Sequence, residues 1–330
     1  MNQAYERIKG TLIGCAYGDA MGMPSEMMTR DILNLAFPDG IHHFEKSSSL
    51  DFFGRKFSAG TVTDDTINTL LVCDTILENH GEFETIPYLT KLQTWMDDNA
   101  EINPYVIGPS TAKALNAIKK GTPISEAGKY GTTNGSAMKV SPLGILYDYH
   151  DVKGFVDKIE ILCLPTHHTN IAIAGASWVA ACVSYAVRGG SDYQQMFATA
   201  QIILEEGMHR GTQLPCPSLQ ERMSNIKELC KVDTDAEFYQ KLEGFYGSGM
   251  ETIETIPAVY AILLRSNCNP NRTALLCANM SGDSDTIGAI ATAIVGAVNP
   301  NFEAADIAIL EKRNTIDFDT YAAKLLKVKQ

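Results

Sequence analysis

The residues best suited to chemistry are acidic side chains gathered in short stretches that lie far apart in the chain. The stretches are Gly18-Asp19-Ala20 with the nearby Pro24-Ser25-Glu26, then Thr63-Asp64-Asp65-Thr66, and then Gly282-Asp283-Ser284-Asp285-Thr286. Carboxylate and hydroxyl oxygens without His or Cys are the ligands that hard divalent cations such as Mg²⁺ and Mn²⁺ prefer. If the fold brings these stretches together, roughly six or seven oxygens converge, which is enough for two metal ions.

Each stretch also has a purely structural interpretation. Asp283 and Asp285 flank the start of a predicted helix, where acidic caps are common, and Thr63 or Asp64 could cap another helix. Adjacent acids at a helix start repel each other unless a cation or solvent compensates. Because the arrangement occurs twice, a shared metal site explains it better than two independent caps do.

Two glycine-containing loops and a histidine pair give weaker signals. Gly and hydroxyl residues in 131–139 precede a helical segment, where backbone N–H groups can cradle a phosphate, and 247–250 repeats this pattern. Taken alone, each loop is explained better by a plain turn. His167-His168 precedes an apolar helical run, so a structural role and a contact with a ligand are both open.

The elements that must position these residues are predicted to be helices almost throughout, because apolar residues recur at helical spacing and strand-like alternation is rare. We therefore expect a compact all-α fold with more than ten helices, in one domain over 1–330, since no Pro/Gly/Ser linker divides the chain. The polar segment 38–60 precedes Thr63 and is interpreted as a lid or rim loop. Helices are predicted at 65–79, 84–98, 110–120, 151–163, 169–188, 192–206, 218–231, 235–243, 251–266, 271–280, 285–298, 303–313 and 317–327.

Composition excludes several classes of function. The net charge of −12, with no cluster of Lys and Arg, argues against non-specific binding to nucleic acid. The longest apolar run, 171–187, is near the lower limit for a membrane span and is predicted to be a buried helix, so no membrane partner is expected. The eight cysteines form no CxxC pair, which favours free thiols in a reducing compartment and a cytoplasmic location.

Taken together, the motifs resemble those of the ADP-ribosylglycohydrolase family. They occur in the family's order, and the joint pattern is specific even though each piece is not. The matching segments are Gly14-Cys15-Ala16-Tyr17-Gly18-Asp19-Ala20-Met21-Gly22-Met23-Pro24-Ser25-Glu26, Thr63-Asp64-Asp65-Thr66, Asn134-Gly135-Ser136-Ala137-Met138-Lys139, Thr166-His167 and Gly282-Asp283-Ser284-Asp285-Thr286-Ile287-Gly288-Ala289.

This resemblance implies an all-α fold with a central cleft that holds two Mg²⁺ ions, or Mn²⁺, and an enzyme that hydrolyses an N- or O-glycosidic bond of ADP-ribose attached to a protein or small molecule. Glu26 would be the catalytic residue that activates water, and Asp285 would bridge the metals. The implied metal ligands are Thr63, Asp64, Asp65, Asp283, Asp285 and Thr286. The implied substrate-binding residues are Asn134, Gly135, Ser136, Ala137, Met138 and His167 around the diphosphate, and Gly247, Ser248, Gly249 and Met250 on the adenosine side.

Three departures from the family pattern bear on the substrate. Lys139 stands where most members have Arg, Ser281-Gly282 replaces a commoner Gly-Gly, and Val106 stands where some arginine-specific relatives carry an acid. Hydrolysis of another ribosyl compound, such as a nucleoside, and a non-catalytic ADP-ribose-binding role are the alternatives. The linkage, the metal used in the cell and the oligomeric state are left open by the sequence.

Overall fold

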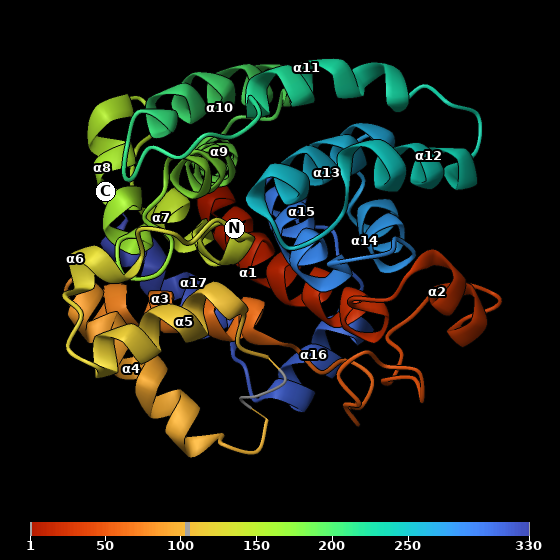
Figure 1. Cartoon of the computed structure of the whole chain (residues 1–330), viewed down its shortest axis with the longest axis horizontal. Coiled ribbons are helices and arrows are strands. Elements are labelled where there is room, and N and C mark those ends of the chain that lie inside the picture. The colour runs from red at the N-terminus through yellow and green to blue at the C-terminus, as the bar shows by residue number, and fades with distance from the viewer. Residues whose placement is uncertain (1, 103–105, 330) are drawn as a thin grey trace. The chain divides into compact units, whose positions relative to one another are not determined.

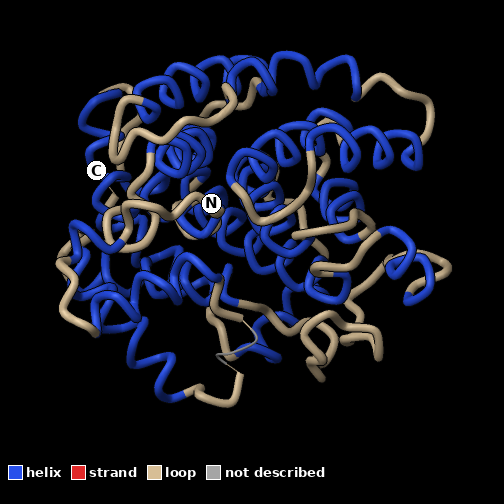
Figure 2. The backbone as a smooth tube through the Cα atoms, in the orientation of Figure 1, coloured by secondary structure: helices blue, strands red, loops and turns tan. Residues whose placement is uncertain are grey.

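Helices joined by loops make up the described chain, as Figure 2 shows. The computed structural model describes residues 2–102 and 106–329. Within these ranges, β-type backbone pairing is limited to two isolated bridges, Met28 with Gly282 and Thr169 with Thr212. The predicted all-α fold class is therefore confirmed.

The chain forms two compact units, each assembled from segments that are distant in sequence. Unit 1 comprises Met1–Ile8, Ile67–Cys216 and Thr320–Gln330, and unit 2 comprises Lys9–Thr66 and Pro217–Asp319. Three of the divisions fall inside helices, which is why no linker in the sequence marks them. The single domain over 1–330 stays a prediction.

Unit 1 is built around α9 (Asn170–Val187), which is buried along almost its whole length and is contacted by α7, α8 and α10 (Figure 1). Its apolar composition and length would suit a membrane span, but 94% of it is buried within the protein. The prediction of a buried helix is thus confirmed. The unit also contains most of α3 (Asp64–Glu78) and α17 (Phe318–Val328), with α4 (Thr85–Asp98), α5 (Pro109–Lys119), α6 (Ile124–Ala127), η3 (Asn134–Ser136), α7 (Ser141–Leu146), α8 (Val152–Cys163) and α10 (Tyr193–Met208).

Unit 2 is built around α15 (Ser284–Val298), which packs on α13 and α14 (Figure 1). Every residue of α15 from Ser284 to Ala297 is buried, as expected for a helix made of small and apolar residues. The other elements of the unit are most of α1 (Gln3–Gly22), η1 (Met23–Ser25), α2 (Arg30–Ala36), α11 (Leu219–Leu229), α12 (Asp235–Lys241), the π-helical turn η4 (Leu242–Tyr246), α13 (Thr252–Arg265), α14 (Pro270–Ala278) and α16 (Ala304–Asn314).

Glycines at every fourth position let α1 lie directly on the backbone of α15. A Cβ atom added to Gly14 would lie 2.1 Å from the carbonyl oxygen of Thr292, and one added to Gly18 would lie 2.1 Å from that of Gly288. The series continues with Gly10 against Gly296 and with Gly22 against Ser284, so the two helices run antiparallel in close contact. This contact fixes Asp19, on α1, beside the first turn of α15.

The predicted helices are all present, with ends within about two residues of the expected positions. Four helices were not predicted: α1, whose repeated glycines are poor helix formers in isolation, and the short helices α2, α6 and α7. All eight cysteines are free thiols, as expected.

Candidate active site

The N-terminus of α15 carries the two aspartates of the third acidic stretch, and a tight turn at Gly282 precedes them. Gly282 has a φ of +87°, and a Cβ there would lie 2.3 Å from the carbonyl oxygen of Ser248, so glycine is required on both counts. Asp283 then donates its backbone N–H to the same carbonyl at 2.7 Å and serves as the N-cap residue of the helix. Asp285 follows in the first turn and is 2% exposed.

Asp19 holds the start of α3. Its carboxylate accepts hydrogen bonds from the backbone N–H groups of Thr63 and Thr66, at 2.9 and 3.1 Å, and from their hydroxyls, at 2.9 and 2.6 Å. The cap of α3 is therefore supplied by another helix, where sequence analysis considered Thr63 or Asp64 for that role. Because Asp19 accepts these N–H groups, the Asp65 carboxylate is not needed as a cap and is free to face Asp285.

Five carboxylates from the three stretches meet in two groups that share Asp285. Asp19, Asp65 and Asp285 form one group, and Glu26, Asp283 and Asp285 form the other; within each group the nearest oxygens lie within 4.8 Å of one another. All five residues belong to unit 2. The structure thus brings together the acidic stretches that the sequence analysis singled out.

Threonine hydroxyls complete the first group. The Thr63 hydroxyl lies 3.2 Å from Asp65 Oδ2 and 3.4 Å from Asp285 Oδ2, and the Thr286 hydroxyl lies 3.4 Å from Asp65 Oδ2. Asp64, at the start of α3, is half-buried and belongs to neither group among the described residues.

The clustered negative charges hold protons more tightly than isolated carboxylates do. Burial, followed by repulsion from Asp285, raises the pKa of Asp19 to about 7, although hydrogen bonds from Thr66 and Thr63 oppose the shift. Burial and the same neighbour raise the pKa of Glu26 and of Asp65 well above their usual ranges. The cluster therefore favours any cation that can neutralise it.

The donor set fits a hard divalent cation. Oδ1 of Asp65 is buried and has no hydrogen-bond partner among the described residues, which is costly unless a cation satisfies it. Its neighbours offer carboxylate and hydroxyl oxygens, the donors typical of Mg²⁺ and Mn²⁺ sites. Among the described ion pairs, Arg55 supplies the one protein cation that reaches these five carboxylates.

Glu26 differs from the other four acids because it keeps contact with solvent. Its side chain is 14% exposed, whereas Asp19, Asp65, Asp283 and Asp285 are sealed in the core, at 4% exposure or less. Met27, the next residue, has a φ of +59° and donates its N–H to the carbonyl of Gly282 at 2.6 Å. The strained turn that carries Glu26 is therefore pinned to the turn that carries Asp283.

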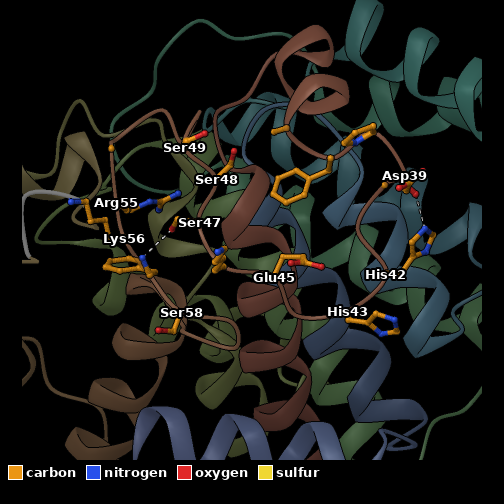
Figure 3. Close-up of a pocket in the computed structure, with 17 residues that line it drawn as sticks. Asp39, His42, His43, Glu45, Ser47, Ser48, Ser49, Arg55, Lys56 and Ser58 are labelled. Carbon is orange, nitrogen blue, oxygen red and sulfur yellow. Dashed lines mark hydrogen bonds between the residues drawn. The ribbon is translucent and has the colours of Figure 1, made fainter.

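The segment 38–60 forms an open recess of about 1180 Å³, shown in Figure 3. Arg55 lies in its lining with Glu45, Lys56 and the serines 47–49. The Ser47 hydroxyl accepts from the N–H of Phe57 at 3.2 Å, which closes the loop on itself. Sequence analysis expected a lid or rim loop here, and the structure shows that this loop supplies Arg55 to Glu26.

Comparison with known proteins identifies the family. The model of the ADP-ribosylglycohydrolase family matches residues 1–301. The chain belongs to that family. The uncharacterized protein YegU of Escherichia coli (strain K12) is 36% identical over 329 residues, 98% of each chain.

More distant relatives of this ADP-ribosylglycohydrolase carry activities in their names. The ADP-ribosylarginine hydrolase Tri1 of Pseudomonas putida (strain GB-1) is 26% identical and covers 90% of this chain and 71% of its own. The ADP-ribosylhydrolase ARH3 of Xenopus tropicalis is 25% identical, with coverage of 90% and 88%. A solved structure titled ADP-ribosylglycohydrolase-related protein complex superposes over the whole of both chains with a TM-score of 0.72 at 20% identity, which shows the shared fold.

Membership of the family makes the protein an enzyme that hydrolyses ADP-ribosyl glycosidic bonds. The loop assigned by resemblance to the adenosine side lies in unit 2 of this glycohydrolase, against the metal-directed acids. Gly247 has a φ of +83°, Gly249 donates its N–H to Glu254 at 2.8 Å, and the carbonyl of Ser248 accepts from Asp283. The contact of Gly247, Ser248, Gly249 and Met250 with substrate stays a prediction.

The residues that the resemblance implies contact the diphosphate, 134–138 and His167, lie together in unit 1. Residues 134–138 are buried, and a Cβ on Gly135 would lie 2.8 Å from the imidazole of His167. His167 Nε2 lies 3.0 Å from the Thr133 hydroxyl. Burial and then the charge of Lys139 lower the pKa of His167 well below its usual range, so this ring is neutral at physiological pH. The diphosphate contact stays a prediction.

Lys139, at the position where the resemblance implies an arginine, is fully buried. Its ammonium lies 5.4 Å from the centre of the Tyr88 ring. The side chain is therefore built into the core of unit 1, where cation–π attraction offsets part of the cost of burying its charge.

Two features of the site were not predicted. Asp19 belongs to an acidic stretch that was expected to supply oxygens to a metal site, but its role as the cap of α3 was not expected, because Thr63 and Thr66 lie more than forty positions away. Arg55 lies in a loop without periodic pattern, so only the fold reveals that it pairs with Glu26. The sequence indicated a role for this loop in the site only through its position directly before Thr63.

Proposed function

We propose that this protein hydrolyses the glycosidic bond between ADP-ribose and a protein side chain or small molecule, using two divalent cations, Mg²⁺ or Mn²⁺. The observation that carries the proposal is the pair of carboxylate groups sharing Asp285. Such a shared acid suits two adjacent hard cations, and the relatives' names support the ADP-ribosyl substrate class. A reducing, cytoplasmic location is part of the same proposal.

The acidic and hydroxyl residues of the site would hold the cations in two groups. Asp19, Asp65 and Asp285 would hold one cation, with Thr63 and Thr286 beside them, and Glu26, Asp283 and Asp285 would hold or face the second. Bound there, divalent cations stabilise negative charge on nearby oxygens and make a neighbouring water more acidic.

Glu26 is the residue best placed to move the proton. It belongs to the second carboxylate group and is also partly exposed, so it can take a proton from water and release it to solvent. That water forms a new bond to the anomeric carbon while the bond to the leaving oxygen or nitrogen breaks, and the leaving group takes up a proton from solvent. The reaction passes through an oxocarbenium-like state, in which positive charge develops on the sugar. The surrounding carboxylates favour such a charge electrostatically.

The test is metal-dependent release of ADP-ribose from arginine-, serine- and O-acetyl-linked substrates, measured with Mg²⁺ or Mn²⁺ and again after chelation. We expect release from at least one linkage, abolished in Asp285→Ala. Arginine linkage is the least expected of the three because Val106 stands where some arginine-specific relatives carry an acid. Metal binding without release from any substrate would overturn the proposal and direct attention to nucleosides.

The variant Glu26→Gln separates proton transfer from metal binding. It keeps the shape of the side chain, so we expect the fold and calorimetric Mn²⁺ binding to change little, while kcat falls about 10²- to 10⁴-fold, the usual contribution of a general base. Near-normal turnover would remove Glu26 from this role.

A further inference from the structure

Arg55 is bound on every side of its guanidinium. Its side chain is fully buried; Nη1 donates to Glu26 Oε2, Nη2 donates to Asp51 Oδ2 at 2.8 Å and to the Met23 carbonyl at 3.1 Å, and Nε donates to Asp51 Oδ2 at 3.1 Å. The charged group also lies 4.8 Å from the centre of the Phe53 ring. Few rotamers satisfy all these partners, so the guanidinium has a single defined position.

Asp51, the main partner of Arg55, is itself held in place. Its Oδ1 accepts the backbone N–H groups of Phe53 at 3.0 Å and of Arg55 at 2.8 Å, and the residue is 8% exposed. The carboxylate therefore anchors both the turn 51–55 and the arginine side chain that leaves it. This double role gives a rigid path from the loop 38–60 to Glu26.

Glu26 lies beside like charges. Its carboxylate shares a group with Asp283 and Asp285, which repel it when ionised, and its side chain is 14% exposed. The ion pair with Arg55 opposes that repulsion and occupies one of the two carboxylate oxygens.

We propose that Arg55, anchored by Asp51, is a positioning residue that holds Glu26 in the orientation needed for proton transfer. This inference rests on the proposed function, because it needs Glu26 to act on water. It assigns the loop 38–60 a catalytic purpose through a named contact. Arg55 itself touches neither the substrate nor the reacting atoms in this scheme.

The decisive measurement is a double-mutant cycle in kcat and KM, with Mn²⁺ saturating and with the linkage that the unaltered enzyme hydrolyses. We expect Arg55→Gln to lower kcat about 10²-fold, the usual cost of a misplaced catalytic group, with KM within about threefold. Arg55→Lys should recover part of the loss, because lysine keeps the positive charge but lacks the planar set of N–H donors that binds Glu26 and Asp51 together. In the Glu26→Gln background, Arg55→Gln should cause no further loss.

Arg265 provides a matched control in the same unit. It also pairs with a carboxylate, Asp235 at 3.2 Å, donates to the carbonyl of Cys230 at 3.2 Å and lies 5.7 Å from the centre of the Phe238 ring. Arg265→Gln should lower the melting temperature while leaving kcat near its unaltered value. Equal loss of kcat in both arginine variants would show that Arg55 acts only through general stability, and would overturn the proposal.

A second cycle is read without substrate. Melting temperatures of Glu26→Gln, Arg55→Gln and the double variant, in chelator, should show losses that are not additive, since the residues form one ion pair. Additive losses would overturn the contact itself. Non-additive melting with no hydrolysis by the unaltered protein would uphold the contact, reject the proposed function, and reject the catalytic purpose of Arg55 with it. An additive loss in kcat would also reject that purpose.

Discussion

At the scale of single residues, the carboxylates that favour cation binding also lower the stability of the protein without a cation. Five carboxylates converge, and the pKa of Asp19, Glu26 and Asp65 rises because each is buried near the others. Asp65 shows the conflict most directly, because its Oδ1 is buried without a hydrogen-bond partner among the described residues. Such an atom lowers stability unless it has a ligand, which favours a functional reason for its presence.

Replacing Asp65 with asparagine tests this conflict. We expect Asp65→Asn to raise the unfolding free energy of the chelator-treated protein by about 1–3 kcal/mol, because it removes one buried, repelled charge. The same change should abolish or greatly weaken Mn²⁺ binding measured by calorimetry. Asp319→Asn is the control, since that carboxylate is 60% exposed and pairs with Lys9 away from the cluster. A destabilised variant with unchanged Mn²⁺ binding would contradict the interpretation.

The acidic stretch that carries Asp19 and Glu26 shows what residue types alone do not predict. Asp19 and Glu26 are seven positions apart, yet one caps α3 and the other pairs with Arg55. The two carboxylates are alike chemically, but they have different roles because their partners, Thr66 and Arg55, come from other segments of the chain. The acidic stretches themselves were predictable, because oxygen-rich motifs repeated at helix starts have few structural explanations.

At the scale of elements, the antiparallel contact of α1 and α15 determines the geometry of the first carboxylate group. Asp19 lies one residue after Gly18, and Asp285 lies three residues before Gly288, and these two glycines face each other. Side chains larger than hydrogen at these positions would push the helices apart. The separation of Asp19 from Asp285 therefore depends on the glycines at least as much as on the acids.

The variant Gly14→Ala tests that dependence away from the acids themselves. Its Cβ would lie 2.1 Å from the Thr292 carbonyl, so we expect a loss of about 1–3 kcal/mol or more in unfolding free energy, together with weaker Mn²⁺ binding. Gly244→Ala is the matched control, because nothing lies within 4 Å of its Cβ and alanine favours helical backbone. Equal stability of the two variants would contradict the close packing.

Helices were predicted correctly where apolar residues recur at helical spacing. A helix was not predicted where tertiary packing stabilises residues of low helix propensity. The expected helix at 285–298 appears as α15, and its residues from Ser284 to Ala297 are buried. By contrast α1 was not predicted, because four glycines make a helix unstable unless a neighbouring backbone lies against them. That neighbour is some 270 residues away in the chain, as the pairing of Gly18 with Gly288 shows.

At the scale of the whole molecule, stability without a divalent cation should fall as pH rises, and a bound cation should remove this fall. The pKa of Asp19 is about 7 in the folded chain and about 3.9 when unfolded, so the folded state binds the extra proton between these values. Without cation, the stability from this group is complete below pH of about 4 and is lost as pH rises toward about 7. A bound cation removes the loss because it replaces the proton.

The corresponding measurement is the melting temperature at pH 5, 6, 7 and 8, in chelator and in saturating Mn²⁺. We expect the curve in chelator to fall with rising pH, and Mn²⁺ to raise the melting temperature most at pH 8. At a concentration 100 times the dissociation constant, one bound ion adds about 2.7 kcal/mol. A melting temperature that rises with pH in chelator would contradict the pKa directions assigned to Asp19, Glu26 and Asp65.

The chain alone was enough to indicate an all-α fold, most helices, an oxygen-rich metal site and the family, because these follow from local periodicity and from short motifs. The fold was needed for the cap that Asp19 provides to α3, for the glycine contact that brings α1 onto α15, and for the pairing of Arg55 with Glu26. Each of these is a contact between segments distant in sequence. No local pattern encodes such a contact, because its energy arises only after the two segments have packed together.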